Sequence, residues 1–124
     1  MKLLDTSAWV EYFKGSEKGK KVRALLAEAE IYTCAMTLAE ISRWFTENNL
    51  PLEQGIRQIK TNSILLDVEE PILVESGRTY VALRKIRPKM GLIDAIIYVT
   101  AARHNLTLIT GDFDFNGLPN VEMM

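Results

Sequence analysis

The sequence predicts a single α/β domain in which a parallel sheet of four or five strands has helices on both faces. The first observation is that short apolar runs alternate along the chain with stretches of helical periodicity. The second is the length of 124 residues, which is near the usual size of one domain. No repeat, low-complexity segment or long linker divides the chain, so we expect one domain over residues 1–124.

The first strand is predicted at residues 2–5, where KLLD is a short apolar run that ends in an acid. Helical material follows at 6–14 and again at 17–29, where apolar residues recur at helical spacing. The second strand is IYTC at 31–34. A helix over 38–48 follows, with apolar residues along one face.

The next helix is predicted to begin at Pro51, because proline suits the first position of a helix. ILLD at 64–67 is the third predicted strand, and Pro71 opens the helix after it. The stretch 91–103 is apolar almost all round, so we expect a largely buried helix there. LTLIT at 106–110 is the fourth strand, and the terminal VEMM is a short fifth.

Composition excludes several classes of protein. Hydrophobic residues make up 48% and charged residues 25%, which is ordinary for a soluble globular protein. No run approaches the roughly 20 apolar residues that span a membrane, and the amino terminus lacks an apolar signal core. Cys34 is the only cysteine, which excludes an intramolecular disulfide and a thiolate metal cluster. We therefore expect a cytoplasmic protein.

The net charge of −1 differs from the basic total that is common in nucleic-acid-binding proteins. The basic residues nevertheless gather in two clusters, namely Lys14, Lys18, Lys20, Lys21 and Arg23, and Arg84, Lys85, Arg87 and Lys89. One interpretation is that both clusters are solvated helix ends. The other is a local basic surface, which acids gathered elsewhere would hide in the net charge.

Four acids are predicted to meet at one edge of the sheet, and we call them the acid quartet: Asp5, Glu40, Asp94 and Asp112. Asp5 ends the first strand and Asp112 follows the fourth. Glu40 lies in the first turn of the helix after the second strand, and Asp94 begins the helix before the fourth. In an alternating parallel sheet these positions share the edge at the carboxyl ends of the strands, where ligands bind.

Each acid also has a purely structural interpretation. Asp5 can cap the helix that follows it. Thr37 and Glu40 form the T-x-x-E pattern of a capping box. Asp94 falls in a first helical turn, where the helix dipole favours an anion, and Asp112 lies in a turn that suits aspartate. Four independent caps, however, would not need to converge on one edge.

Crowded carboxylates repel one another, and a hard divalent cation such as Mg²⁺ or Mn²⁺ removes that cost through oxygen ligation. Such ions promote hydrolysis of phosphodiesters. Competing chemistries lack their residues: there is no Gly-rich phosphate loop, and LLDTS lacks the second acid of a D-x-D-x-T motif. An early acidic pair of the response-regulator type is also missing. His104 is predicted about 15 Å from Asp94, at the opposite end of the same helix.

Four segments resemble the PIN-domain family, and within it the small VapC-type toxins: LLDTS at 3–7, TLAEI at 37–41, GLIDAIIYVTAARHNLTLIT at 91–110 and TGDFDF at 110–115. The resemblance extends over essentially the whole chain in the correct order. It implies a Rossmann-like fold and a Mg²⁺- or Mn²⁺-dependent endoribonuclease that hydrolyses single-stranded or structured RNA. It also implies a homodimer and a cognate antitoxin that blocks the active site.

Residue by residue, the resemblance assigns the catalytic and metal-binding carboxylates to the acid quartet. Ser7 and Thr110 match supporting hydroxyl positions, which would orient the acids. Asp114 is a further candidate metal ligand. Gly111 departs from the pattern, because many relatives carry a basic residue there, and this puts a contact to the RNA backbone in doubt.

Five aromatic residues lie on the two helices next to the expected site. Phe13 and Phe45 continue apolar faces, so we expect them in the core. We expect Trp9, Tyr12 and Trp44 to form part of a dimer or antitoxin surface, where aromatic residues are enriched.

Two alternatives remain for the function. A structure-specific DNA nuclease uses the same acidic site, although such enzymes are longer and carry a helical arch. A catalytically weak module would bind RNA or an antitoxin without cleaving RNA. Binding of Mn²⁺ separates these alternatives, since an enzyme requires the metal and a non-cleaving module does not.

Overall fold

The computed structural model describes residues 1–124, and its sheet is parallel throughout with the strand order β3-β2-β1-β4-β5. The strands are β1 (Lys2–Leu4), β2 (Ile31–Cys34), β3 (Ile64–Leu66), β4 (Thr107–Thr110) and β5 (Val121–Met123). The helices are α1 (Thr6–Lys14), α2 (Glu17–Glu28), α3 (Met36–Glu47), α4 (Leu52–Asn62), α5 (Glu70–Arg84) and α6 (Leu92–Arg103), with a 3₁₀ helix η1 (Phe113–Phe115). The predicted α/β class, the parallel sheet and its fifth strand are confirmed.

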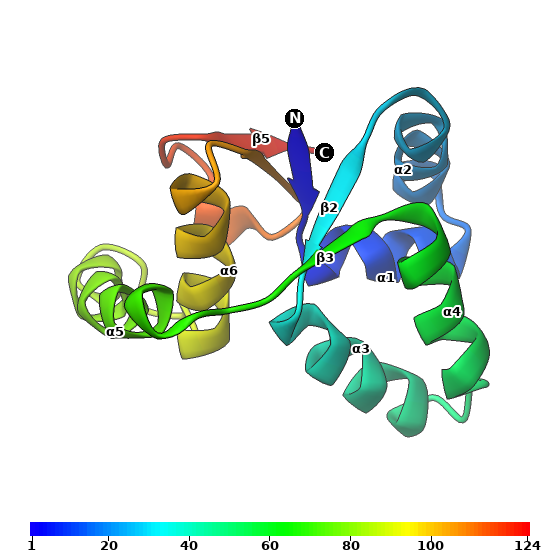
Figure 1. The fold of residues 1–124 in the computed structure, drawn as a ribbon, viewed down its shortest axis with the longest axis horizontal. Coiled ribbons are helices and arrows are strands. Elements are labelled where there is room, and N and C mark those ends of the chain that lie inside the picture. The colour runs from blue at the N-terminus through cyan, green and yellow to red at the C-terminus, as the bar shows by residue number, and fades with distance from the viewer.

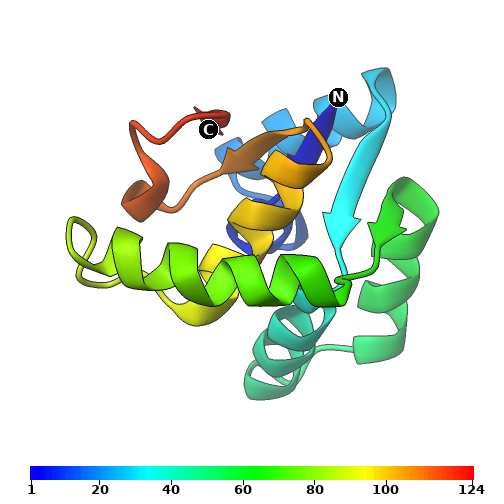
Figure 2. The same cartoon turned by 60° about the vertical axis from the view of Figure 1, so that its left-hand side comes forward.

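Helices cover both faces of the sheet, as predicted. In Figure 1, α5 and α6 lie on one side of the strands, and α1 to α4 lie on the other. Figure 2 shows α5 running along the outside of α6. Neighbouring residues Leu3 and Leu4 of β1 belong to different hydrophobic cores, because alternate side chains of a strand point to opposite faces.

Helix α6 is the most deeply buried helix, which confirms the prediction from its apolar sequence. Six of its residues are buried, namely Ala95, Ile96, Ile97, Val99, Thr100 and Ala101. No helix of the structure has the length and apolar character that are needed to cross a membrane. Pro51 differs from expectation, because its backbone is extended and it precedes α4 as the N-cap rather than beginning the helix.

The burial of the aromatic residues of α1 and α3 differs in part from the prediction. Trp9 was expected at the surface, but its side chain is completely buried, and its Nε1 donates a hydrogen bond to Thr33 Oγ1 at 3.0 Å. The core accepts this large ring because β2 supplies a partner for its only polar group. Phe45 is buried as predicted, whereas Tyr12 and Trp44 are half-buried.

Candidate active site

The strand order reverses beside β1, because β2 and β3 extend the sheet in one direction and β4 and β5 extend it in the other. In parallel α/β sheets a crevice forms at the carboxyl ends of the strands at this point. Asp5 directly follows β1, and its backbone amide donates to Ile109 O of β4 at 2.9 Å. The first acid therefore lies at the centre of the edge where the sequence predicts a site.

Asp5 is held by hydroxyl groups rather than by the helix that it precedes. It is only 3% exposed, and its Oδ2 accepts hydrogen bonds from Ser7 Oγ and Thr110 Oγ1, both at 2.8 Å. Asp5 occupies the N-cap position of α1, but its side chain makes no capping hydrogen bond. The interpretation of Asp5 as a simple cap is therefore wrong, and the two predicted supporting hydroxyls both contact this acid.

The same hydroxyls, from α1 and β4, also bind the segment after β4. Gly111 N donates to Ser7 Oγ at 3.0 Å, and Asp112 N donates to Thr110 Oγ1 at 2.9 Å. Asp112 in turn accepts a hydrogen bond from Asp114 N at 3.0 Å and so caps η1. Asp112 is therefore a local cap, as its structural interpretation predicted, and it is also tied to the frame around Asp5.

Glu40 is the acid whose local role differs most from the sequence pattern. The N-cap of α3 is Ala35 rather than Thr37, so Glu40 lies in the second turn and forms no capping box. Its Oε1 instead accepts a hydrogen bond from Thr6 Oγ1 at 2.6 Å, and Thr6 Oγ1 also lies 3.1 Å from the buried Thr37 Oγ1. Glu40 thus faces α1 and the end of β1.

Asp94 completes the set from the other face of the sheet. It is half-buried at the start of α6, and its Oδ2 accepts a hydrogen bond from Gly91 N at 2.9 Å. Asp94 thus lies in the first turn of α6, as predicted, and it also accepts a hydrogen bond from the N-cap backbone. Each carboxylate of the quartet uses one oxygen for these contacts, namely Asp5 Oδ2, Glu40 Oε1, Asp94 Oδ2 and Asp112 Oδ1.

The acids are close enough to influence one another electrostatically. Burial raises the pKa of Asp5, and the charge of Glu40 adds to this rise against the hydrogen bonds from hydroxyl groups. Burial also raises the pKa of Glu40, with further contributions from Asp94 and Asp112, while the hydrogen bond from Thr6 lowers it. The structure therefore brings together side chains from four separate segments of the chain.

The pKa of Asp94 is raised in the same direction. Its pKa is raised to about 6, mainly by burial, and the hydrogen bond from Gly91 opposes the rise. Three other acids add to it through their negative charge: Asp5, Asp112 and Asp114. No three Asp, Glu, His or Cys side chains are arranged as a ready metal-binding group. The quartet therefore shares one edge of the sheet without forming a closed coordination shell.

We expect the free energy of unfolding of the metal-free protein to rise as the pH falls from about 7.5 to about 5.5. A carboxyl whose pKa is about 6 in the folded protein, above its ordinary value of 3.8, binds a proton first in the folded state. The stability that the folded protein gains from protonation of Asp94 is complete below the pKa of the unfolded chain. It is lost as the pH rises through about 6. Denaturant titrations in EDTA at both pH values measure the change.

The control for this pH dependence is Asp94→Asn, since asparagine keeps an acceptor for Gly91 N but cannot titrate. The rise in stability should be smaller in this variant than in the wild type. Equal stability of the wild type at both pH values would show that neither burial nor the neighbouring acids raise the pKa of Asp94 in the folded protein.

The sequence did not reveal two residues that hold the site together. Thr6 supplies the hydroxyl that binds Glu40, and its only signal was its place directly after Asp5. Arg87 belongs to the second basic cluster, where solvated helix ends were one interpretation. Its Nε donates to Asp114 O at 2.9 Å and its Nη2 donates to Asn116 O at 2.7 Å, so this guanidinium fixes η1 beside the acids.

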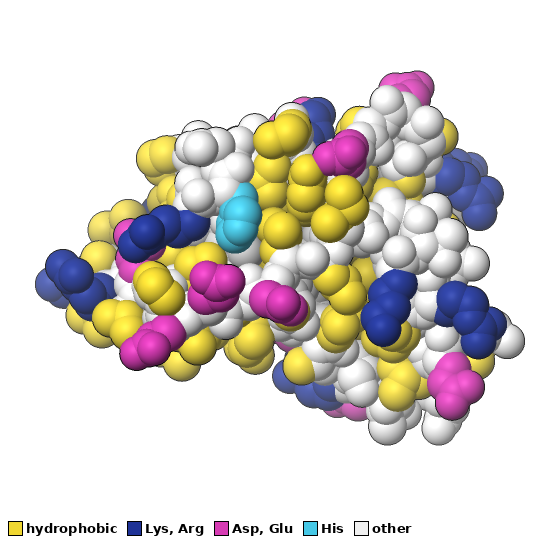
Figure 3. Space-filling view, in the orientation of Figure 1, with side chains coloured by type: hydrophobic (Ala, Val, Ile, Leu, Met, Phe, Trp, Pro, Cys, Tyr) yellow, Lys and Arg dark blue, Asp and Glu magenta, His cyan; other side chains and the backbone are white.

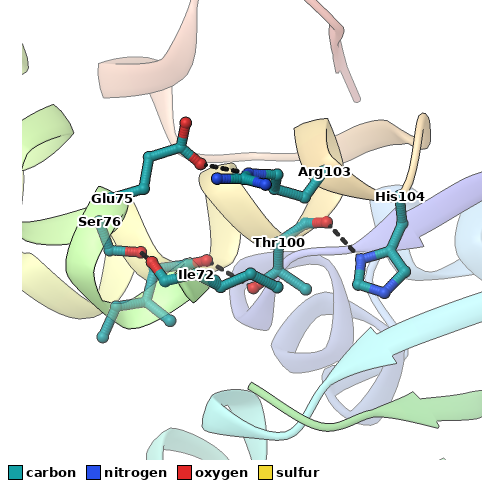
Figure 4. Close-up of polar contacts among 7 residues, drawn as sticks. Ile72, Glu75, Ser76, Thr100, Arg103 and His104 are labelled. Atoms are coloured by element: carbon teal, nitrogen blue, oxygen red, sulfur yellow. Dashed lines mark hydrogen bonds and ion pairs between the residues drawn. The ribbon is translucent and has the colours of Figure 1, made fainter. Parts of the chain in front are cut away.

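His104 lies away from the acids, as predicted. It is the C-cap of α6, and its Nδ1 lies 2.9 Å from Thr100 O. Figure 3 shows this histidine at the surface among hydrophobic and scattered charged side chains. In Figure 4, Arg103 beside it points to Glu75 of α5, and its Nε lies 2.6 Å from Glu75 Oε2. This region fastens α5 to α6 and contributes no group to the acid edge.

Known proteins share the sequence pattern and the fold of this chain. The family model described as the PIN domain matches residues 2–120. A VapC ribonuclease of Mycobacterium bovis and ribonuclease VapC11 of Mycobacterium tuberculosis are each 31% identical to this chain, covering 98% of it and 93% of the relative. A toxin-antitoxin complex from Klebsiella pneumoniae has a chain with a TM-score of 0.75 and 29% identity, covering 98% of this chain and 96% of that one. VapC20 from M. tuberculosis, with a TM-score of 0.72 and 16% identity over 94% of this chain and 92% of its own, shares the fold.

Proposed function

The chain belongs to the PIN domain family, and from this premise we propose that it is a metal-dependent endoribonuclease and the toxin of a toxin-antitoxin pair. The observation that carries the proposal is the gathering of the acid quartet at the reversal of strand order, where burial and mutual repulsion raise the pKa values of Asp5, Glu40 and Asp94. The ribonucleases to which the chain is 31% identical support RNA as the substrate.

The residues of the quartet fit a hard divalent cation by the chemistry of their donors. All are carboxylate oxygens, which Mg²⁺ and Mn²⁺ prefer, and each carboxylate has a second oxygen besides the one named in its hydrogen bonds. We assign the metal to the quartet, with Asp114 as a further candidate. A bound ion would activate water and neutralise charge on the leaving oxygen.

The protein's own contribution is orientation. Ser7 and Thr110 hold Asp5 through one oxygen, and Thr6 holds Glu40 in the same way. Hydrogen bonds of this kind restrict the rotamers of metal ligands and so reduce the reorganisation that binding requires. Protonation of Asp94, favoured by its raised pKa, would compete with metal binding at acidic pH.

Protein partners are part of the proposal. The similar chain in the toxin-antitoxin complex from Klebsiella pneumoniae, which is 29% identical, supports a cognate antitoxin. Large exposed hydrophobic side chains on and just after α5 support a homodimer or another protein contact: Leu73, Val74, Val81 and Ile86. Hydrophobic atoms are visible over this part of the molecule in Figure 3. A monomer in light scattering at every concentration would contradict the homodimer.

A purified chain should cleave single-stranded RNA with Mg²⁺ or Mn²⁺ and lose this activity in EDTA. Mn²⁺ should also raise the thermal midpoint, because a ligand at about 100 times its Kd adds about 2.7 kcal/mol to the free energy of unfolding. Gel analysis of a labelled RNA and a thermal melt measure the two effects.

The absence of a ready metal-binding group favours one alternative, a module that binds RNA or an antitoxin without cleaving RNA. That module would bind RNA yet show neither cleavage nor a thermal shift with Mn²⁺. Cleavage of branched DNA with no cleavage of RNA would instead identify a structure-specific DNA nuclease.

A further inference from the structure

A hollow of about 340 Å³ lies directly beside the acid quartet. Its lining residues come from α1, α2 and the segment after β4, namely Thr6, Ser7, Val10, Glu11, Lys18 and Gly111. Two of these residues bind acids of the quartet, since Thr6 donates to Glu40 and Ser7 donates to Asp5. A group held in this hollow therefore lies next to the proposed reaction site.

The backbone around Lys18 is fixed by close packing of α2 against α1. A Cβ atom at Gly19 would lie 2.0 Å from Glu11 O, so only glycine allows the two helices to approach this closely. The turn between the helices is also defined: Gly15 has a φ of 66°, and Ser16 Oγ accepts a hydrogen bond from Gly19 N at 3.0 Å. The stem of Lys18 therefore starts from a rigid position at the rim of the hollow.

Lys18 is not neutralised by an acid near the hollow, so its ammonium group can bind an anion. Glu11, the one acid in the lining, pairs with Lys14 at 3.5 Å, and Lys20 pairs with Glu17 at 3.0 Å. Lys18 is exposed and takes part in none of the ion pairs of the structure. Gly111, on the segment after β4, adds no side chain to the lining.

We propose that this hollow binds a phosphate group of the RNA strand and that the Lys18 ammonium is its cationic partner. A strand that approaches the acid quartet meets negative charge, and a lysine at the rim offsets this repulsion at the neighbouring phosphate. Lys18 is a positioning residue in this scheme, because it holds the strand while the acids act on another phosphodiester. The inference rests on the proposed ribonuclease function.

The test compares Lys18→Gln with Lys20→Gln, which removes the same charge from the same helix but lies outside the hollow. We expect Lys18→Gln to raise the KM for single-stranded RNA about 5-fold or more, with little change in kcat, and to reduce the slope of log affinity against log salt by about 0.7. Lys20→Gln should leave both quantities near wild type, and Lys18→Arg should retain the wild-type slope.

Three outcomes overturn the inference while RNA cleavage by the wild type upholds the proposed function. These are unchanged KM in Lys18→Gln, equal losses in Lys18→Gln and Lys20→Gln, or a loss confined to kcat. If the wild type does not cleave RNA, the phosphate site is tested by binding instead. Lys18→Gln and Lys20→Gln are each combined with Glu40→Gln, and their affinity for a labelled RNA is measured by fluorescence anisotropy. Weaker RNA binding in Lys18→Gln than in Lys20→Gln then supports the phosphate site, and equal binding overturns it.

Discussion

Glu40→Gln is expected to lower the rate of single-stranded RNA hydrolysis by about 100-fold or more, the scale of losing one charge-stabilising group from an active site. The free energy of unfolding should stay within about 0.5 kcal/mol of the wild type. Glutamine is nearly isosteric and keeps an oxygen that can accept from Thr6 Oγ1, which lies 2.6 Å from Glu40 Oε1. The substitution therefore removes charge while it preserves the contact between α3 and α1.

Glu47→Gln provides the matched control for this experiment. Glu47 lies on the same helix, its side chain is 64% exposed, and it pairs with Arg43 at 3.5 Å rather than with the acid edge. Its hydrolysis rate should equal that of the wild type. If Glu40→Gln also cleaves RNA at the wild-type rate in Mg²⁺ or Mn²⁺, Glu40 only joins α3 to α1, and the catalytic set consists of the three aspartates.

Trp9→Ala is expected to reduce the free energy of unfolding by about 3–5 kcal/mol, the usual range for emptying a large aromatic site in a core. The Trp9 side chain is completely buried between the sheet and the helices on its face. Single domains are stable by only about 5–15 kcal/mol, so this variant should lose a large part of its stability. Urea titration followed by circular dichroism measures the loss.

Two further variants separate packing from hydrogen bonding at this position. Trp9→Phe removes the N–H donor to Thr33 Oγ1 but keeps an aromatic ring in the core. Thr33 Oγ1 still has a hydrogen-bond partner in Ser63 Oγ, at 2.8 Å. The loss in free energy of unfolding should therefore be smaller for Trp9→Phe than for Trp9→Ala. Trp44→Ala truncates a half-buried ring on α3 and should also cost less than Trp9→Ala. A loss below about 1 kcal/mol for Trp9→Ala would mean that the indole is not an anchor of this core.

The elements that sequence reasoning predicted correctly are those in which periodicity and topology agree. Helix α6 was identified because its residues are apolar all round, and six of them are buried. The common edge of the acids followed from the alternation of strands and helices, since the carboxyl ends of parallel strands meet on one side. Both inferences depend on patterns along the chain and need no knowledge of contacts between distant residues.

The local environment of each acid required the tertiary structure. The T-x-x-E pattern at Thr37 is compatible with a capping box, but Ala35 is the N-cap of α3. Thr6, which is 34 residues away from Glu40, binds its carboxylate. Asp5 likewise depends on Thr110, which is 105 residues distant. A hydrogen bond across such a separation leaves no periodic signal near either residue, so residue pattern alone does not reveal it.

Hydrophobic periodicity and chain connectivity were sufficient to predict the order of strands and helices along the chain, the parallel sheet and the edge on which the acids lie. The burial of Trp9 in the core and the position of Lys18 at the hollow next to the acid quartet became evident from the packed helices. Both depend on how closely helices pack, and a single missing Cβ at Gly19 controls that approach between α1 and α2.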